Sequence, residues 1–183
     1  MVLTGFMGTG KTAVGRALAA SLEFGFVDTD DLVRERAGRD IPVIFEQEGE
    51  AGFRRREREV VASLAGRTGL VIATGGGGVS DAGNAAVLRG LGPLVWLRAR
   101  PETILDRVGS GEARPMLAGA RGSAAMLRRI GQLLASREAD YAAADIAVDT
   151  DGIDPGETAS AILVALERRG ARGEASGEPP GRA

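Results

Sequence analysis

Directly after Met1 the chain reads Val2-Leu3-Thr4-Gly5-Phe6-Met7-Gly8-Thr9-Gly10-Lys11-Thr12. A short apolar run, predicted to be a strand, leads into the spacing G-x-x-x-x-G-K-T, and an amphipathic stretch over residues 11–22 predicts a helix after it. In such a loop the backbone N–H groups converge on a phosphate, and the helix N-terminus adds partial positive charge. The sequence therefore predicts a phosphate-binding loop.

The loop chemistry gives its polar residues separate tasks. Lys11 is expected to reach the β- and γ-phosphate oxygens, and the Thr12 hydroxyl is expected to ligate Mg²⁺. The residues predicted to surround the nucleotide phosphates are Gly8, Thr9, Gly10, Lys11, Thr12 and Ala13. The alternative is a plain glycine-rich turn, since the chain holds 28 glycines. Against it, 22 of the 23 basic residues are arginine and the only lysine is Lys11, at the place where a compact charge must reach between phosphates.

Composition limits the other possibilities. The 183 residues suffice for one α/β domain with a substantial core. A net charge of −2 and a pI near 5.4 argue against a general affinity for nucleic acid or for an anionic membrane. Histidine and cysteine are both missing, which removes the commonest general base and all thiolate chemistry. No leader peptide or membrane-spanning run is recognisable, so a cytoplasmic location is expected.

Short apolar runs alternate with longer amphipathic stretches, which is typical of βαβ units on a parallel sheet. Strands are predicted at 2–4, 25–28, 70–74, 94–98 and 146–149. Helices are predicted at 11–22, 31–37, 42–48, 51–65, 81–91, 101–107, 124–142 and 155–168. Residues 1–169 are expected to form a single domain, with a long functional loop at 109–123, and 170–183 to form a disordered tail.

Two carboxylates end the second predicted strand. Asp28 and Asp30 are two residues apart, so their side chains share a face of an extended chain, at the strand end where open α/β sheets bind ligands. One of them could hold Mg²⁺, directly or through water, while the other accepts a proton from an acceptor hydroxyl. The alternative is helix capping by Asp30 or Asp31. Because the chain has no histidine, a carboxylate is the natural base.

Five segments in a fixed order carry a family resemblance: residues 5–12, Asp28-Thr29-Asp30, Phe45-Glu46-Gln47-Glu48-Gly49-Glu50-Ala51-Gly52-Phe53-Arg54, Thr74-Gly75-Gly76-Gly77 and Arg114-Pro115-Met116-Leu117. Together they resemble shikimate kinase over roughly residues 2–166. The resemblance implies an α/β, three-layer P-loop kinase of the nucleoside-monophosphate-kinase type, with a five-stranded parallel sheet flanked by helices and a mobile lid. It also implies a monomer that transfers the γ-phosphoryl of ATP to the 3-hydroxyl of shikimate, in the pathway to chorismate and the aromatic amino acids.

The same resemblance implies a substrate site. Arg54 corresponds to an arginine that binds the shikimate carboxylate, and Glu57, on the same helical face, would support it. Arg137 matches a second carboxylate-binding arginine, although the family's Arg-x-Pro-x-Tyr lacks its proline here. Without the resemblance both arginines would be taken as surface residues. The glycines implied to contact substrate or to shape its loop are Gly75, Gly76 and Gly77.

At the nucleotide end, the resemblance implies that Arg114 lies on the lid and faces the transferring phosphoryl group, excluding water as the lid closes. Arg107 corresponds to an arginine that stacks on adenine, and Pro155 follows Asp154 in the segment next to the base. The alternatives are an ordinary surface arginine and an ordinary helix N-terminus. Two rival functions stay open: another small-molecule kinase, for gluconate or a nucleotide, and a non-catalytic ATP-binding module.

Overall fold

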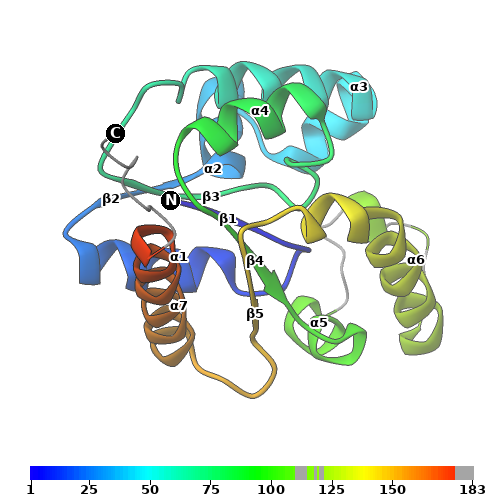
Figure 1. The fold of residues 1–183 in the computed structure, drawn as a ribbon. Coiled ribbons are helices and arrows are strands. Elements are labelled where there is room, and N and C mark those ends of the chain that lie inside the picture. Colours follow the sequence, from blue (N-terminus) through cyan, green and yellow to red (C-terminus); the bar gives the residue numbers. More distant parts are fainter. Residues whose placement is uncertain (110–114, 118, 120–121, 176–183) are drawn as a thin grey trace.

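The computed structural model describes residues 1–109, 115–117, 119 and 122–175, with side chains described as far as residue 170. Five parallel strands form one sheet in the order β2-β3-β1-β4-β5 (Figure 1). The strands are β1 Val2–Thr4, β2 Gly25–Asp28, β3 Leu70–Ala73, β4 Leu94–Arg98 and β5 Ile146–Asp149. The predicted fold class and all five predicted strands are confirmed, with β3 one residue shorter than expected.

Helices cover both faces of the sheet, and Figure 1 shows α1 and α7 on one side and α3 and α4 on the other. The helices are α1 Lys11–Leu22, α2 Thr29–Ala37, α3 Ile41–Ala62, α4 Ala82–Gly90, α5 Pro101–Val108, α6 Ser123–Ala142 and α7 Pro155–Ala175, with a 3₁₀ turn η1 at Pro115–Leu117. No helix in the described part of the chain is long and apolar enough to cross a membrane.

Alternate residues of the central strands feed two separate apolar cores. Leu3 and Val95 pack with α1 and α7, whereas Val2 and Leu94 pack with α3, α4 and α6. All four side chains are fully buried. Because both faces are covered, these strands read as continuous apolar runs rather than as alternating ones, as is usual for parallel sheets.

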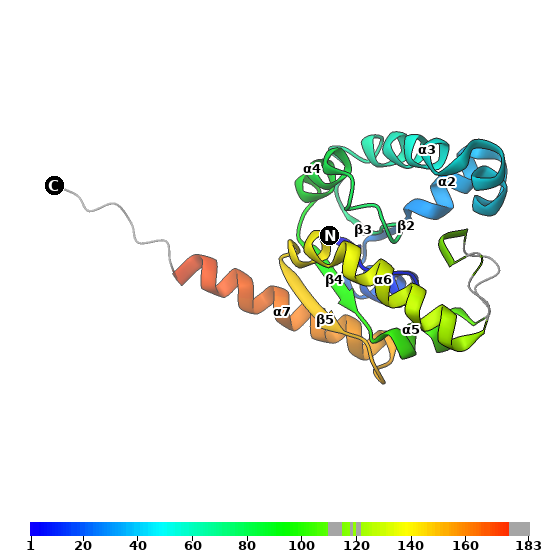
Figure 2. The same ribbon diagram turned by 90° about the vertical axis from the view of Figure 1, so that its right-hand side faces the viewer.

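The long element α3 consists of two helical halves joined at a kink, as predicted: Gly49, with φ 68° and ψ −176°, has a non-helical backbone between the predicted helices 42–48 and 51–65. The second half ends at Ala62, three residues earlier than predicted. Glu48 ties the two halves together by accepting hydrogen bonds from Arg56 at 2.8 and 3.0 Å. At the other end of the chain, α7 continues to Ala175, past Gly170 where the tail was predicted to start (Figure 2). The last described turns in Figure 2 project away from the sheet.

The sheet order brings three loops to one edge. β1 leads into the phosphate loop, β2 ends at Asp28, and β3 leads into the glycine loop 74–78. The register pairs Asp28 with Ala73 and Leu3 with Ala73, so these strands end close together. Carboxyl ends of parallel strands are where open α/β sheets bind ligands.

Candidate active site

The phosphate loop wraps the N-terminus of α1. Gly10 caps the helix in the left-handed region (φ 90°), without a side-chain hydrogen bond, and the first turn holds no acidic residue. The positive end of the helix dipole therefore faces the loop. The Lys11 ammonium donates to the Gly5 and Phe6 carbonyl oxygens, both at 2.8 Å, and the side chain is 9% exposed. This arrangement suits an anion such as a phosphate.

A cavity of about 820 Å³ opens over this helix end. Predicted nucleotide and metal residues line it: Gly8, Gly10, Lys11, Thr12, Ala13, Asp28 and Arg107. Thr9, which was also predicted to bind the nucleotide, is not among the lining residues. Its buried hydroxyl donates to the Phe6 carbonyl at 2.8 Å and so stabilises the loop. A nucleotide in this cavity would place its phosphates against the loop backbone.

Of the two residues predicted at the adenine end, one lines this cavity. Arg107 on α5 donates to the Gly8 carbonyl at 3.2 Å and to the Thr150 hydroxyl at 3.0 Å, which joins the phosphate loop to the end of β5. Pro155 is exposed in the first turn of α7, where Asp154 caps the helix, and it is not among the described lining residues. The structure thus brings Arg107, but not Pro155, to the nucleotide cavity.

Asp28 does two things at the end of β2. Its Oδ1 accepts the Asp30 N–H at 3.0 Å and caps α2, so the capping residue is Asp28 rather than Asp30 or Asp31. Its Oδ2 accepts the Thr12 hydroxyl at 2.8 Å. Neighbouring ligands of an octahedral Mg²⁺ with bonds of about 2.1 Å lie roughly 3 Å apart, so this oxygen pair suits the ion. No group of three metal-ligating acidic side chains occurs among the described residues, and Mg²⁺ commonly takes its other ligands from water and phosphates.

A second, smaller cavity of about 90 Å³ lies beside the first. Its polar lining contains every residue predicted to bind the substrate: Asp30, Arg54, Gly75, Gly76, Gly77 and Arg137, together with Glu57. The apolar lining is Met7, Ile41, Phe45, Phe53, Pro115 and Met116. Two arginines in the lining of a largely apolar cavity favour a small organic acid as its occupant.

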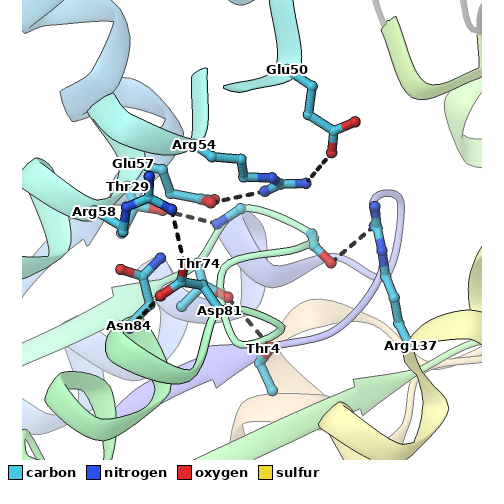
Figure 3. A network of polar contacts seen from close by, with 12 residues as sticks. Thr4, Thr29, Glu50, Arg54, Glu57, Arg58, Thr74, Asp81, Asn84 and Arg137 are labelled. Carbon is cyan, nitrogen blue, oxygen red and sulfur yellow. Dashed lines mark hydrogen bonds and ion pairs between the residues drawn. The ribbon is translucent and has the colours of Figure 1, made fainter. Parts of the chain in front are cut away.

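Arg54 is held in place by acidic neighbours (Figure 3). Its guanidinium donates to Glu57 at 2.8 Å and to Glu50 at 3.2 Å, and it lies over the Phe53 ring at 5.4 Å. Burial alone would lower the pKa of Arg54, but the Glu57 and Glu50 carboxylates together outweigh burial and raise it. The predicted support from Glu57 is confirmed as a contact, and Arg55 and Arg56 pair with Glu48 as an ion-paired surface run.

The glycine loop passes very close to functional side chains. A Cβ at Gly75 would lie 2.5 Å from Asp30 Oδ1, and one at Gly77 would lie 2.8 Å from Arg54 Nη2. The Thr29 hydroxyl accepts the Gly75 N–H at 2.9 Å, which ties this loop to the start of α2 (Figure 3). Glycine at these positions lets the backbone line the cavity without displacing Asp30 or Arg54.

Arg137 reaches the same loop from α6. Its Nη1 donates to the Gly76 carbonyl at 3.1 Å, and its guanidinium lies over the Phe6 ring at 5.7 Å (Figure 3). The side chain is 8% exposed, so the surface alternative is wrong for this arginine. Arg54 and Arg137, far apart in the sequence, thus line one cavity.

Four of the described residues line both cavities: Met7, Asp30, Ile41 and Gly76. Asp30 is therefore the carboxylate that lies between the larger cavity, called the phosphate cavity below, and the smaller one, called the acid cavity. The apolar lining of the acid cavity, called the apolar wall below, was not predicted from the sequence. Phe45 and Phe53 lie in a motif quoted for the resemblance, but their spacing indicates buried core positions on one face of a helix. Predicted lid residue Arg114 lies outside the described residues, while its neighbours Pro115 and Met116 border the acid cavity.

Comparison with known proteins agrees with this geometry. The family model described as shikimate kinase matches residues 7–167. The shikimate kinase of Moorella thermoacetica is 48% identical, over 91% of this chain and 94% of that protein. That of Symbiobacterium thermophilum is also 48% identical, over 94% of this chain and 99% of that protein.

Solved structures give the same answer. The shikimate kinase from Acinetobacter baumannii, solved in complex with shikimate, superposes with a TM-score of 0.86 at 36% identity over 92% of each chain. A gluconokinase from Sinorhizobium meliloti gives a TM-score of 0.60 at 16% identity, over 97% of this chain and 96% of that one, which is a likeness of fold alone. The chain belongs to the shikimate kinase family, and it is an ATP-dependent phosphotransferase.

Proposed function

We propose that this enzyme transfers the γ-phosphoryl group of ATP to the 3-hydroxyl of shikimate, with Asp30 as the proton acceptor. The observation that carries the proposal is the position of Asp30, which lines the phosphate cavity and the acid cavity at once. A hydroxyl that enters from the acid side can meet a phosphoryl group that enters from the other side next to this carboxylate. General bases of this kind must lie within hydrogen-bond reach of the proton that they take.

The proposed step is a single in-line displacement. The acceptor oxygen forms a bond to the γ-phosphorus while the bond from that phosphorus to the bridging oxygen breaks. ADP leaves, and the acceptor proton passes to an Asp30 oxygen. Lys11 and the N-terminus of α1 stabilise the charge on the phosphate oxygens, which is the main contribution a protein makes to phosphoryl transfer.

Arg54 and Arg137 are proposed to hold the substrate carboxylate. Both line the acid cavity, and the glycine loop passes between them with its backbone against each guanidinium. The Acinetobacter baumannii relative, with TM-score 0.86, was solved with shikimate bound, which supports a site for the same acid here. Planar guanidinium groups suit a carboxylate because each can donate two parallel hydrogen bonds.

Replacing Arg54 with lysine is expected to raise the KM for shikimate about tenfold, or ~1.4 kcal/mol, with a smaller effect on the KM for ATP. The ammonium keeps the charge but loses the fork geometry and one of the contacts to Glu50 and Glu57. Steady-state kinetics with each substrate varied would measure both constants. The exposed Arg55 serves as the control, since Arg55→Lys changes the same chemistry outside the cavity. An unchanged KM for shikimate would remove Arg54 from the site.

We propose that Thr12 and Asp28 hold Mg²⁺, the first directly and the second directly or through water. The 2.8 Å separation of their oxygens supports this pair. When bound, the ion supplies positive charge to the phosphates. Removing divalent cations with a chelator should abolish turnover, and added Mg²⁺ should restore it; full activity in the chelator would contradict the proposal.

The segment around η1 is proposed to act as a lid that carries Arg114 toward the phosphoryl group. Pro115 and Met116 line the acid cavity, and Leu117, 2% exposed, is anchored in the α5–α6 core, which supports a closing role for this segment. Arg107 is proposed to contact adenine, supported by its place in the nucleotide cavity, and Pro155 remains a prediction from the resemblance.

The chain is proposed to act as a monomer in the cytoplasm. The monomeric state is the one that the resemblance implies. A cytoplasmic location is supported by the use of ATP as co-substrate.

A coupled assay of ADP release tests the proposed acceptor. Shikimate, gluconate and a nucleoside monophosphate would be compared at matched concentrations with ATP and Mg²⁺. Turnover with shikimate, at least about a hundredfold above the other two in kcat/KM, is expected because shikimate holds its carboxylate and hydroxyls on one small ring. Gluconate is an open chain, and a nucleoside monophosphate has no carboxylate. Preferred turnover of gluconate or a nucleotide, or no turnover with any acceptor, would contradict the proposal.

A further inference from the structure

A single carbonyl in the acid cavity receives two hydrogen bonds from α6. The Gly76 oxygen accepts Arg137 Nη1 at 3.1 Å and also the Tyr141 hydroxyl. Arg137 and Tyr141 are four residues apart and lie on one face of the helix. Their shared acceptor lies more than 60 residues away in the sequence, in the loop that lines both cavities.

The hydroxyl of Tyr141 is fixed by its surroundings. The side chain is fully buried, belongs to the core formed with α3 and α4, and its ring centroid lies 5.8 Å from that of Trp96. Burial raises the pKa of Tyr141 above its ordinary value, so the hydroxyl remains a donor throughout the physiological pH range. A buried tyrosine hydroxyl normally needs a partner, and here that partner is the Gly76 carbonyl.

The second donor to that carbonyl has a competing task. Under the proposed function Arg137 turns its guanidinium toward the carboxylate of the substrate. If it were the sole donor, that movement would leave a partly buried carbonyl oxygen without a hydrogen bond from the protein, which is unfavourable. The Tyr141 hydroxyl supplies a second donor to this oxygen, which can remain when the guanidinium turns toward the substrate. The same hydrogen bond keeps the Gly76 backbone close to the phosphate loop. A Cβ placed on Gly76 would lie 3.3 Å from the Met7 backbone nitrogen.

We propose that Tyr141 is a positioning residue for the acid substrate: by holding the Gly76 carbonyl it releases Arg137 to bind the carboxylate. The inference rests on the proposed function. It assigns Tyr141 an effect on shikimate binding that a core tyrosine would not have, since packing alone would be served equally well by phenylalanine.

Tyr141→Phe removes the hydroxyl and keeps the ring, so the core packing is retained. The variant should bind shikimate about tenfold more weakly, the scale expected for one lost hydrogen bond to a partly buried acceptor. The KM for shikimate should rise by the same factor, whereas the KM for ATP and the kcat at saturation should stay within about twofold. Calorimetric titration of shikimate without ATP would measure binding apart from catalysis.

Two further comparisons separate positioning from general loop support. The methyl ester of shikimate is neutral and does not draw Arg137 away from Gly76, so its dissociation constant should change less than about twofold in Tyr141→Phe. Ser136→Ala removes a hydroxyl from the neighbouring position of α6, one that donates to the Leu133 carbonyl of the same helix at 2.9 Å. This control should bind shikimate as the unmodified protein does.

A tenfold loss confined to shikimate would support the inference. Unchanged shikimate binding in Tyr141→Phe, or an equal loss for the ester, would overturn it while leaving the proposed function intact. An unmodified protein that neither binds nor phosphorylates shikimate would overturn the proposed function, and the inference with it.

Discussion

Replacing Asp30 with asparagine is expected to lower kcat about a thousandfold while leaving the dissociation constant for ATP within about twofold. Asparagine has nearly the same shape but cannot accept the acceptor proton, so the loss should fall on the chemical step. The chain offers no substitute, because it has no histidine and Asp28 is already engaged by the Thr12 hydroxyl and the Asp30 N–H. Single-turnover kinetics and equilibrium binding of ATP would measure the two effects separately.

Glu35→Gln is a matched control for Asp30→Asn. Glu35 is an exposed carboxylate on the same helix, α2, and does not line either cavity, so neutralising it removes the same charge without touching the site. A loss of ATP affinity comparable to the loss of kcat would instead assign Asp30 to the nucleotide and its metal. Wild-type turnover by Asp30→Asn would remove it from proton transfer altogether.

The second large effect is expected for Lys11→Arg, a change that keeps the charge. The Lys11 ammonium sits between the Gly5 and Phe6 carbonyls at 2.8 Å from each and is 9% exposed, so a broad, planar guanidinium cannot occupy the same position. We expect kcat/KM for ATP to fall about a hundredfold, similar to the loss of one donor to a developing anionic oxygen. Steady-state kinetics with ATP varied at saturating shikimate would measure it.

The reciprocal exchange on the same helix is its control. Arg16 lies on α1 with its guanidinium over the Phe26 ring at 5.0 Å, outside both cavities. Arg16→Lys should leave kcat/KM within about twofold. A Lys11→Arg enzyme that works as well as the unmodified one would show that this position needs only a positive charge, and the single lysine of the chain would then carry no functional meaning.

Much of this site could be predicted because its signals are local. The spacing from Gly5 to Thr12 fixes a loop on a helix N-terminus, and the strand ends follow from alternating apolar and amphipathic stretches. The resemblance then supplied Arg54 and Arg137, which spacing alone would have left on the surface. Glu57 could be paired with Arg54 because residues three apart on a helix are neighbours.

The features that escaped prediction depend on contacts between distant segments. The convergence of Arg137 and Tyr141 on the Gly76 carbonyl cannot be read from either segment by itself. The apolar wall has the same helical period as a core face, so Phe45 and Phe53 gave no sign that they line a cavity.

The most direct test of the central claim is the identity of the product. Shikimate labelled with ¹³C would be incubated with ATP, Mg²⁺ and the enzyme, and phosphorus–carbon coupling would be read by NMR. Formation of one ADP for each phosphomonoester is the result that the position of Asp30 between the two cavities predicts. The family resemblance adds that the coupling should appear at the carbon that bears the 3-hydroxyl. Release of inorganic phosphate without an ester, or an ester on another hydroxyl, would contradict it.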